Sequence, residues 1–292
     1  MGKLAALIVA KMARSRDEKV VMLGDVRQTR QAVAEMMADL RSPETLIAQG
    51  RDPLHALYII GQNQMSVFAE ALSALPEFKR FTRIVAKAED MYIPGGPSMS
   101  PLTASYFTLW AMCDVRVKRD ETMGSCLADL IRLQAFDPLL VATFEAMQAS
   151  RMGFYEHLGF REGRPVLQDI LTGVEYPCLV PAGHAGEKGE LWYARVLPPI
   201  DDWLGYSIVF TTPYVLLKQS RAEWLEFFAR QEEAMARAFN GMTPERQREA
   251  FLKFGLNDYY WNEFIFQGYV NATANVIWLT GLPDIPASLP HA

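Results

Sequence analysis

The chain has 292 residues, of which half are apolar and 22% are charged. This composition excludes intrinsic disorder, collagen-like repeats and coiled coils as descriptions of the whole chain, and it predicts a globular protein with a sizeable core. The 29 Lys and Arg residues against 34 Asp and Glu residues give a net charge of −5. A general polyanion binder needs a basic surface that neutralises phosphates, so we expect no nucleic-acid partner.

The first 160 residues are predicted to be helical. Between residues 54 and 75 the apolar side chains recur at steps of three and four, and Asp52 and Pro53 supply a cap and a first-turn proline for this helix. The remaining helices predicted in this region are 78–88, one that begins at Ser100 and Pro101, 122–135 and 138–158. No membrane partner is expected, because the apolar run at 4–10 is far shorter than the roughly 20 residues of a membrane span.

Short apolar runs bounded by Gly and Pro replace the helical pattern after residue 163. The runs at 166–171, 174–180, 191–197 and 206–217 are predicted strands, with a tight turn at Thr172 and Gly173. We expect them to form a small antiparallel sheet or half-open barrel of about four strands.

The helical period returns after this β-module. Ser220 is a predicted cap, Thr243 and Pro244 start a second helix, and Asn257 starts an aromatic third one. The predicted fold class is α+β, with a helical region at 1–160, an antiparallel β-module at 161–218 and C-terminal helices at 219–292 that pack back on the rest. No flexible linker separates these regions, so we expect one cooperative unit in which the helical segments enclose the β-module.

The three Cys residues and four His residues are widely scattered. No pair of Cys has the spacing of a zinc or redox motif, and no two His residues lie within four residues of each other. We therefore expect no metal site, no cofactor and a reducing cytoplasmic location.

The β-module carries a resemblance to a known group. The residues concerned are Leu167, Asp169, Leu171, Thr172 and Gly173, followed by Trp192, Arg195, Val196, Leu197 and Pro198. With these residues the segment 163–218 resembles the small β-module of uncharacterised bacterial proteins related to those with a SEC-C zinc motif. The Cys and His cluster of that motif is absent from this chain, so the resemblance implies a bacterial cytoplasmic protein and carries over neither zinc binding nor translocase-like contacts.

The segment 181–190 is the main candidate site. Its glycines would let the backbone approach a ligand, and His184, Lys188 and Arg195 could converge on an anionic group. The segment joins two predicted strands, unlike a phosphate loop, so a plain hairpin turn is the alternative. For Arg195 the alternative is a structural ion pair with a carboxylate such as Asp169.

Two further segments carry candidate groups. A hydroxyl nucleophile could lie within 92–105, where Ser98 or Ser100 would need His184 as a base, but Ser100 before Pro101 is also an expected helix cap. Aromatic residues from Tyr259 to Trp278 could line a pocket or pack against the β-module.

These observations lead to two functional hypotheses. The first is a cytoplasmic binding or interaction protein, with a regulatory role as one option. Its partner would be an unknown protein or a small anionic ligand held by His184, Lys188 and Arg195, and formation of a homo-oligomer stays open. The alternative is a hydrolase that uses Ser98 or Ser100 with His184.

Overall fold

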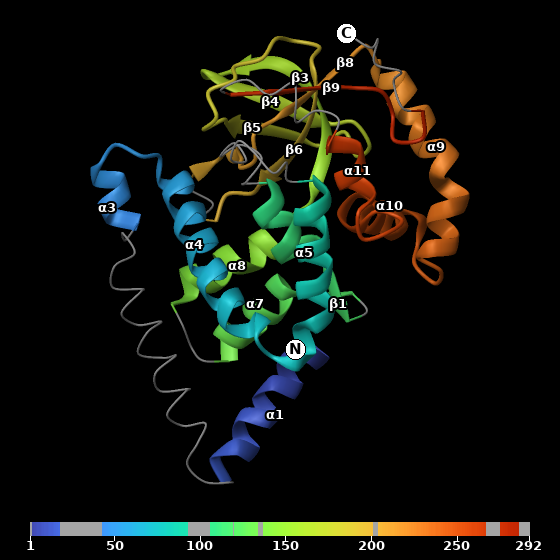
Figure 1. Cartoon of the computed structure of the whole chain (residues 1–292). Coiled ribbons are helices and arrows are strands. Elements are labelled where there is room, and N and C mark those ends of the chain that lie inside the picture. The colour runs from blue at the N-terminus through green and yellow to red at the C-terminus, as the bar shows by residue number, and fades with distance from the viewer. Residues whose placement is uncertain are drawn as a thin grey trace. The chain divides into compact units, whose positions relative to one another are not determined.

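The computed structural model describes residues 2–17, 43–92, 106–118, 120–133, 137–200, 204–266 and 275–285. The chain divides into two compact units (Figure 1). The first consists of Met1–Lys87 and Thr108–Ala149, and the second of Ala88–Phe107 and Ser150–Ala292. None of the described helices is long and apolar enough to cross a membrane.

The first unit is built mainly of helices. Its elements are α1 (Lys3–Asp17), α3 (Pro43–Ala48), α4 (Pro53–Ser73), a 3-10 turn (Pro76–Phe78), α5 (Lys79–Tyr92, whose last residues belong to the second unit), a π-helical turn (Trp110–Asp114), the hairpin strands β1 (Arg116–Lys118) and β2 (Glu121–Thr122), α7 (Met123–Leu133) and α8 (Pro138–Ala149). The predicted start of α4 is confirmed, because the Asp52 carboxylate accepts hydrogen bonds from the backbone N–H groups of Leu54 and His55.

The second unit contains a seven-stranded sheet. Its strands are β3 (Met152–Arg161), β4 (Arg164–Asp169), β5 (Glu175–Leu179), β6 (Leu191–Leu197), β7 (Ser207–Val209), β8 (Tyr214–Leu217) and β9 (Ile277–Thr280), in the order β3-β4-β5-β7-β6-β8-β9. A further antiparallel pairing of β3 with β6 closes the first five of these strands into a barrel. Closure with β5 parallel to β7 gives a five-stranded Greek-key barrel, the architecture of OB folds.

The mixed helix and sheet content agrees with the α+β prediction, but the small antiparallel module is wrong. The structure has a barrel with an extension, in which β5 is parallel to β7 and β8 is parallel to β9. The predicted helix at 138–158 is also wrong in its second half, because α8 ends at Ala149 and β3 begins at Met152. Both faces of β3 are buried from Met152 to Tyr155, so this strand lacks the alternation that identifies a half-buried strand.

The two faces of β3 and β6 bury different groups. Inside the barrel lies one apolar cluster to which all five barrel strands contribute; its members are Tyr155, Leu167, Cys178, Trp192, Ala194, Val209, Val215 and Val276. The outer face of the same two strands carries Phe154 and Tyr193, whose ring centroids are 4.6 Å apart. Because side chains alternate along a strand, Trp192 points inward and Tyr193 points outward.

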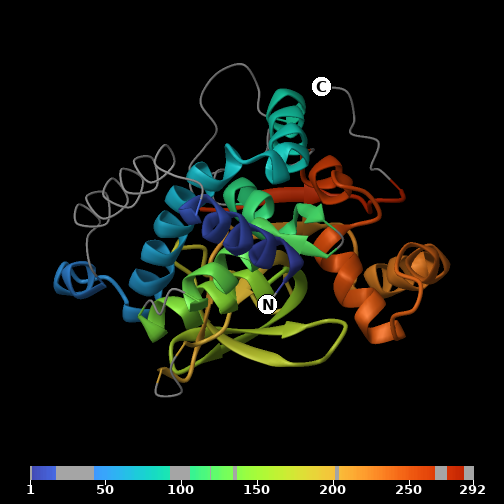
Figure 2. The same cartoon turned by 90° about the horizontal axis from the view of Figure 1, so that it is seen from below.

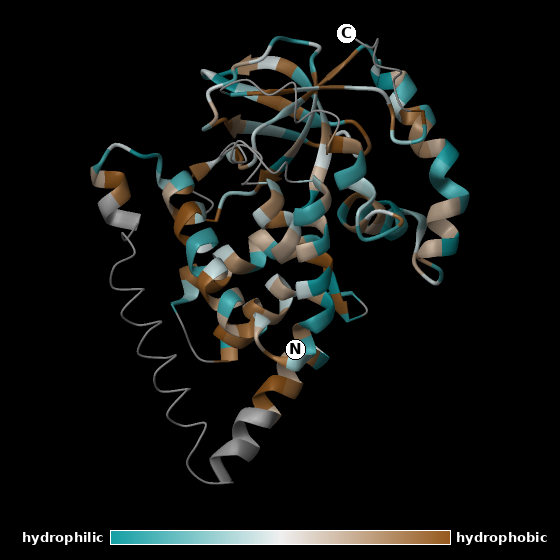
Figure 3. Ribbon diagram, in the orientation of Figure 1, coloured by the Kyte–Doolittle hydropathy of each residue, from teal (hydrophilic) through white to brown (hydrophobic). Residues whose placement is uncertain are grey.

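Three helices cover this outer face: α9 (Arg221–Ala238), α10 (Pro244–Phe254) and α11 (Tyr260–Phe266). Trp224 of α9 stacks on Phe154 at 4.4 Å, and Trp261 of α11 lies 5.6 Å from Tyr193. Helices α9 and α10 lie side by side in both views (Figures 1 and 2), and hydrophobic and hydrophilic stretches alternate along α9 (Figure 3). Of the two predicted roles for the aromatic residues from Tyr259 to Trp278, packing against the β-module is confirmed for Trp261 and Phe264, which contact Tyr193, whereas Tyr259 and Phe266 contact Tyr92.

Candidate functional site

His184 and Glu190 form a hydrogen-bonded pair, here called the dyad, in the loop between β5 and β6. His184 Nε2 lies 3.2 Å from Glu190 Oε2. A carboxylate can only accept, so this bond selects the tautomer in which Nε2 carries the hydrogen. The side chains are 14% and 23% exposed, respectively, so the dyad is shielded but reachable from solvent.

Two tryptophans fix the position of the dyad. The buried Trp192 of β6 donates its indole N–H to Glu190 Oε2 over 2.9 Å, so this oxygen accepts two hydrogen bonds. The His184 ring packs on Trp192 with centroids 5.3 Å apart and lies nearly perpendicular to the Trp278 ring, with centroids 6.1 Å apart. Trp278 belongs to β9 and is half-buried. The dyad is therefore held in one orientation by aromatic contacts as well as hydrogen bonds.

His157 of β3 anchors the loop that carries the dyad. Its ring is fully buried; Nδ1 accepts the Gly159 N–H over 3.0 Å, which leaves Nε2 to donate to the Ala185 carbonyl at 3.2 Å. The main chain adds two bonds, from His157 N–H to the Glu190 carbonyl and from Gly189 N–H to the His157 carbonyl. These contacts tie the loop to β3, a strand of the barrel.

Gly186 shows how closely the loop packs. A Cβ at this position would lie 3.1 Å from His157 Cδ2 and closer still to the Trp192 ring, and the residue has a φ of +70°. Only glycine combines this backbone conformation with this approach. The loop glycines are predicted to let the backbone approach a ligand, whereas at Gly186 the backbone approaches the side chains of Trp192 and His157.

Each member of the dyad keeps one polar atom available. Within the described part of the chain, His184 Nδ1 and Glu190 Oε1 have no hydrogen-bond partner. A carboxylate that holds one imidazole nitrogen while the other stays open is the arrangement by which proteins orient a histidine for ligand contact or proton transfer. The pair thus offers one acceptor on each of its two side chains.

The predicted convergence of His184, Lys188 and Arg195 is wrong. Arg195 is fully buried and lies on the face of β6 opposite Trp192, on which His184 packs. Lys188 is exposed on the loop. Since residues three apart in a strand point to opposite faces, no movement of the loop alone could bring His184 onto Arg195.

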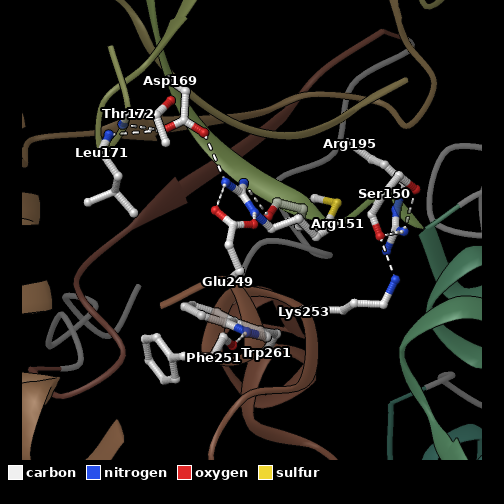
Figure 4. Close-up of polar contacts among 11 residues, drawn as sticks. Ser150, Arg151, Asp169, Leu171, Thr172, Arg195, Glu249, Phe251, Lys253 and Trp261 are labelled. Atoms are coloured by element: carbon white, nitrogen blue, oxygen red, sulfur yellow. Dashed lines mark hydrogen bonds and ion pairs between the residues drawn. The ribbon is translucent and has the colours of Figure 1, made fainter. Parts of the chain in front are cut away.

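Arg195 takes part in a second polar cluster (Figure 4). Its guanidinium donates to the carbonyl and the hydroxyl of Ser150, at 3.1 and 3.0 Å, and Lys253 of α10 donates to the same carbonyl at 2.8 Å. The predicted ion pair between Arg195 and Asp169 is also wrong, because Asp169 pairs with Arg151 instead, at 3.1 Å.

Arg151 lies between two carboxylates in this cluster. It contacts Asp169 and, through two hydrogen bonds of 2.5 and 2.8 Å, Glu249 of α10. Burial by itself lowers the pKa of Arg151, but the hydrogen bond and charge of Glu249 and the charge of Asp169 outweigh it, so the pKa is raised. Asp169 also accepts the backbone N–H groups of Leu171 and Thr172. Through Arg151, which directly precedes β3, this network ties β4 to α10, which is a structural role.

The other predicted groups give no additional site. Ser98 and Ser100 lie outside the described residues, so the structure does not place a nucleophile near His184. In the part of the chain that is described, no group of three or more His, Cys, Asp or Glu residues could hold a metal ion. All three cysteines are free and buried.

Sequence reasoning missed Glu190, the partner of His184. Its signal was its position two residues before Trp192, which places both side chains on one face of the chain as β6 begins. No protein-family model matches this chain, and no curated protein or solved structure is significantly similar to it.

Proposed function

We propose that this chain is a cytoplasmic binding protein whose second unit holds a small ligand at the dyad. The observation that carries the proposal is the pair of open acceptors, His184 Nδ1 and Glu190 Oε1, on side chains that are otherwise fixed by Trp192 and Trp278. A site whose groups are held before the ligand arrives loses little conformational entropy on binding. The three buried free thiols support a reducing compartment.

The connection between β5 and β6 is not the predicted hairpin turn, because β7 lies between these two strands in the sheet. The segment between Leu179 and Leu191 has eleven residues, with glycines in the left-handed region at 183, 186 and 189. The buried His157 donates a hydrogen bond to the Ala185 carbonyl of this loop. A loop that is anchored by hydrogen bonds and carries a partly exposed His and Glu is typical of binding sites on a rigid barrel.

Native mass spectrometry of the full chain tests this function. The protein would be incubated with a small-molecule extract of its expression host and then dialysed. We expect the wild type to retain a small molecule, because the dyad is preorganised, and Glu190→Gln together with His184→Ala to lose it. Lys188→Ala is the matched control and should retain the same adduct, since Lys188 lies outside the dyad. Equal retention by the double variant, or a wild type that retains nothing, would contradict the proposal.

A hydrolase is the second candidate, because one feature of the dyad favours it. Glu190 orients His184 as the carboxylate orients the histidine in a catalytic triad, which leaves Nδ1 to act as the base. The test is labelling by a fluorophosphonate probe followed by peptide mapping. Labelling of Ser98 or Ser100 that His184→Ala abolishes would support the hydrolase. No labelling of either serine in folded wild-type protein would rule it out.

A further inference from the structure

We propose that the group recognised at the dyad is a small organic ammonium ion. This inference rests on the proposed function, and the ligand is a cation, whereas the sequence of the loop predicts an anion. It follows from the hydrogen-bonding polarity of the dyad, from its charge and from its aromatic walls.

The hydrogen-bonding polarity comes first. In the tautomer that Glu190 selects, His184 Nδ1 is a lone-pair acceptor, and Glu190 Oε1 is an acceptor as well. An ammonium group carries only donors and can therefore donate to either of these atoms, of which Glu190 Oε1 carries the charge. A phosphate or carboxylate carries mainly acceptors, so it would set its lone pairs against those of the dyad.

Charge points the same way. Glu190 supplies the carboxylate of the dyad, and neither Lys188 nor Arg195 pairs with it: Lys188 is exposed on the loop and Arg195 is buried behind β6. Residues 151–292 carry twelve basic and seventeen acidic side chains, so the wider field also favours cations. A charge-assisted hydrogen bond from an ammonium to Glu190 Oε1 would be stronger than a neutral one.

Aromatic rings supply the third element. The His184 ring contacts the rings of both Trp192 and Trp278. Trp278 is half-buried, so part of its indole is accessible beside the dyad. Indole rings attract organic cations through their electron-rich faces, and an ammonium that carries alkyl groups also gains apolar contact. A carboxylate beside tryptophans is therefore suited to an alkylammonium group.

The test is a titration of the full chain followed by NMR. Trp192 donates its indole N–H to Glu190, so its Nε1–H resonance reports directly on the dyad. Methylammonium chloride and sodium phosphate would be added in separate titrations at constant ionic strength. We expect methylammonium to shift this resonance in a saturable way and phosphate to leave it unchanged.

A matched pair of variants separates the dyad from the general charge of the loop. Glu190→Gln and Glu187→Gln each remove one negative charge from the same loop, but Glu187 is exposed and its side chain does not contact His184 among the described contacts. We expect Glu190→Gln to weaken methylammonium binding by about tenfold or more and Glu187→Gln to change it by less than about twofold. An unchanged melting temperature and indole spectrum would show that each variant is folded, and Trp278→Leu, which should also weaken binding, provides a second route if Glu190→Gln unfolds.

The outcomes distinguish the ligand class from the site itself. If phosphate shifts the Trp192 resonance and methylammonium does not, the dyad binds ligands but the ammonium assignment is wrong. If Glu187→Gln weakens binding as much as Glu190→Gln, the cation responds to bulk charge and the assignment also fails. If neither ion shifts the resonance while native mass spectrometry still finds a ligand lost with the dyad, only the ammonium assignment fails; if both experiments are negative, the proposed function fails.

Discussion

Single residues in this protein owe their roles to the face of the strand on which they lie. Arg195 and His184 are near each other in sequence, yet β6 sends Arg195 towards Ser150 while His184 packs on Trp192. A charged group at 0% exposure is held by specific hydrogen bonds, whereas the exposed Lys188 is not.

The first prediction compares these two cations. Arg195→Ala should lower the free energy of unfolding by about 3 kcal/mol, because the Ser150 carbonyl and hydroxyl lose a charged donor and a cavity forms. Lys188→Ala should change it by less than about 0.5 kcal/mol. Urea unfolding followed by circular dichroism measures both. Similar, small effects for the two variants would show that Arg195 does not stabilise the fold.

The second prediction concerns the thiols. Burial raises the pKa of Cys178, and burial together with the charges of Glu121 and Asp129 raises that of Cys126 to about 12. A raised pKa lowers the thiolate fraction at pH 8, and the thiolate is the reactive form. Native protein should therefore react with Ellman's reagent at none of its three cysteines within the time in which a free thiol reacts fully. Guanidinium should expose all three, and rapid native reaction of any cysteine would contradict the buried positions.

The sequence identified the segment that carries the candidate site but not the contacts that its side chains make. The segment 181–190 was recognisable from its glycines and His184, since both are local signals. The pairing of His184 with Glu190 has only an indirect signal, the position of Glu190 two residues before Trp192, because a loop without a regular period gives no rule for which side chains meet. The anionic ligand was inferred from Lys188 and Arg195, and only the register of β3 against β6 shows that Arg195 faces away.

At the scale of elements, the helix starts predicted from capping residues are confirmed at two helices. The predicted caps Ser220 and Thr243 each accept a backbone N–H at the start of their helices. Ser220 and Glu223 form a capping box, in which the Ser220 N–H and hydroxyl donate to the Glu223 carboxylate at 2.7 and 2.8 Å.

The third prediction tests this box. Ser220→Ala should lower the free energy of unfolding by about 1 kcal/mol at pH 7. The hydrogen bonds from Ser220 lower the pKa of Glu223, so their stabilisation is present above the ordinary glutamate pKa and is lost as the pH falls through the lowered value. The cost of Ser220→Ala should thus be smaller at pH 3 than at pH 7. Ser73→Ala, which removes a hydroxyl bonded to the Glu70 carbonyl, is the control and should show no such pH dependence.

Two kinds of strand were not predicted from the sequence: a strand that is buried on both faces, and a strand that pairs with another far away in the sequence. β3 is buried on both sides and so resembles a helix in hydropathy, and β9 pairs with β8 across about 60 residues of helical chain. Strand pairing at that separation depends on tertiary packing, which no local pattern encodes. The resemblance of 163–218 to a bacterial β-module stays a prediction.

At the scale of the molecule, the sequence predicted the succession of helices, sheet and helices but placed its boundary at residue 160. The structure places a boundary between compact units at 149 and 150, because β3 belongs with the barrel. In the second unit, helices α9 to α11 cover the outer face of β3 and β6 with large aromatic side chains.

The fourth prediction follows from this cover. Truncation after Lys218 removes α9, α10, α11 and β9, and leaves Phe154 and Tyr193 without Trp224 and Trp261. Each large side chain that loses its burial costs about 1.5 to 3 kcal/mol, so the fragment 1–218 should be insoluble or melt without cooperativity. A soluble fragment with a sharp calorimetric transition would show that the C-terminal helices form a separate domain.

The central claim of this account is that Glu190 holds His184 in one tautomer with Nδ1 open at the site. A long-range proton–nitrogen NMR correlation of the histidine rings in the full chain measures this directly. At a pH at which the ring is neutral, we expect wild-type His184 to carry its hydrogen on Nε2, with Nδ1 at the chemical shift of an unprotonated nitrogen, and Lys188→Ala to leave that pattern unchanged. A His184 protonated at Nδ1, or a pattern that Glu190→Ala does not alter, would contradict the account.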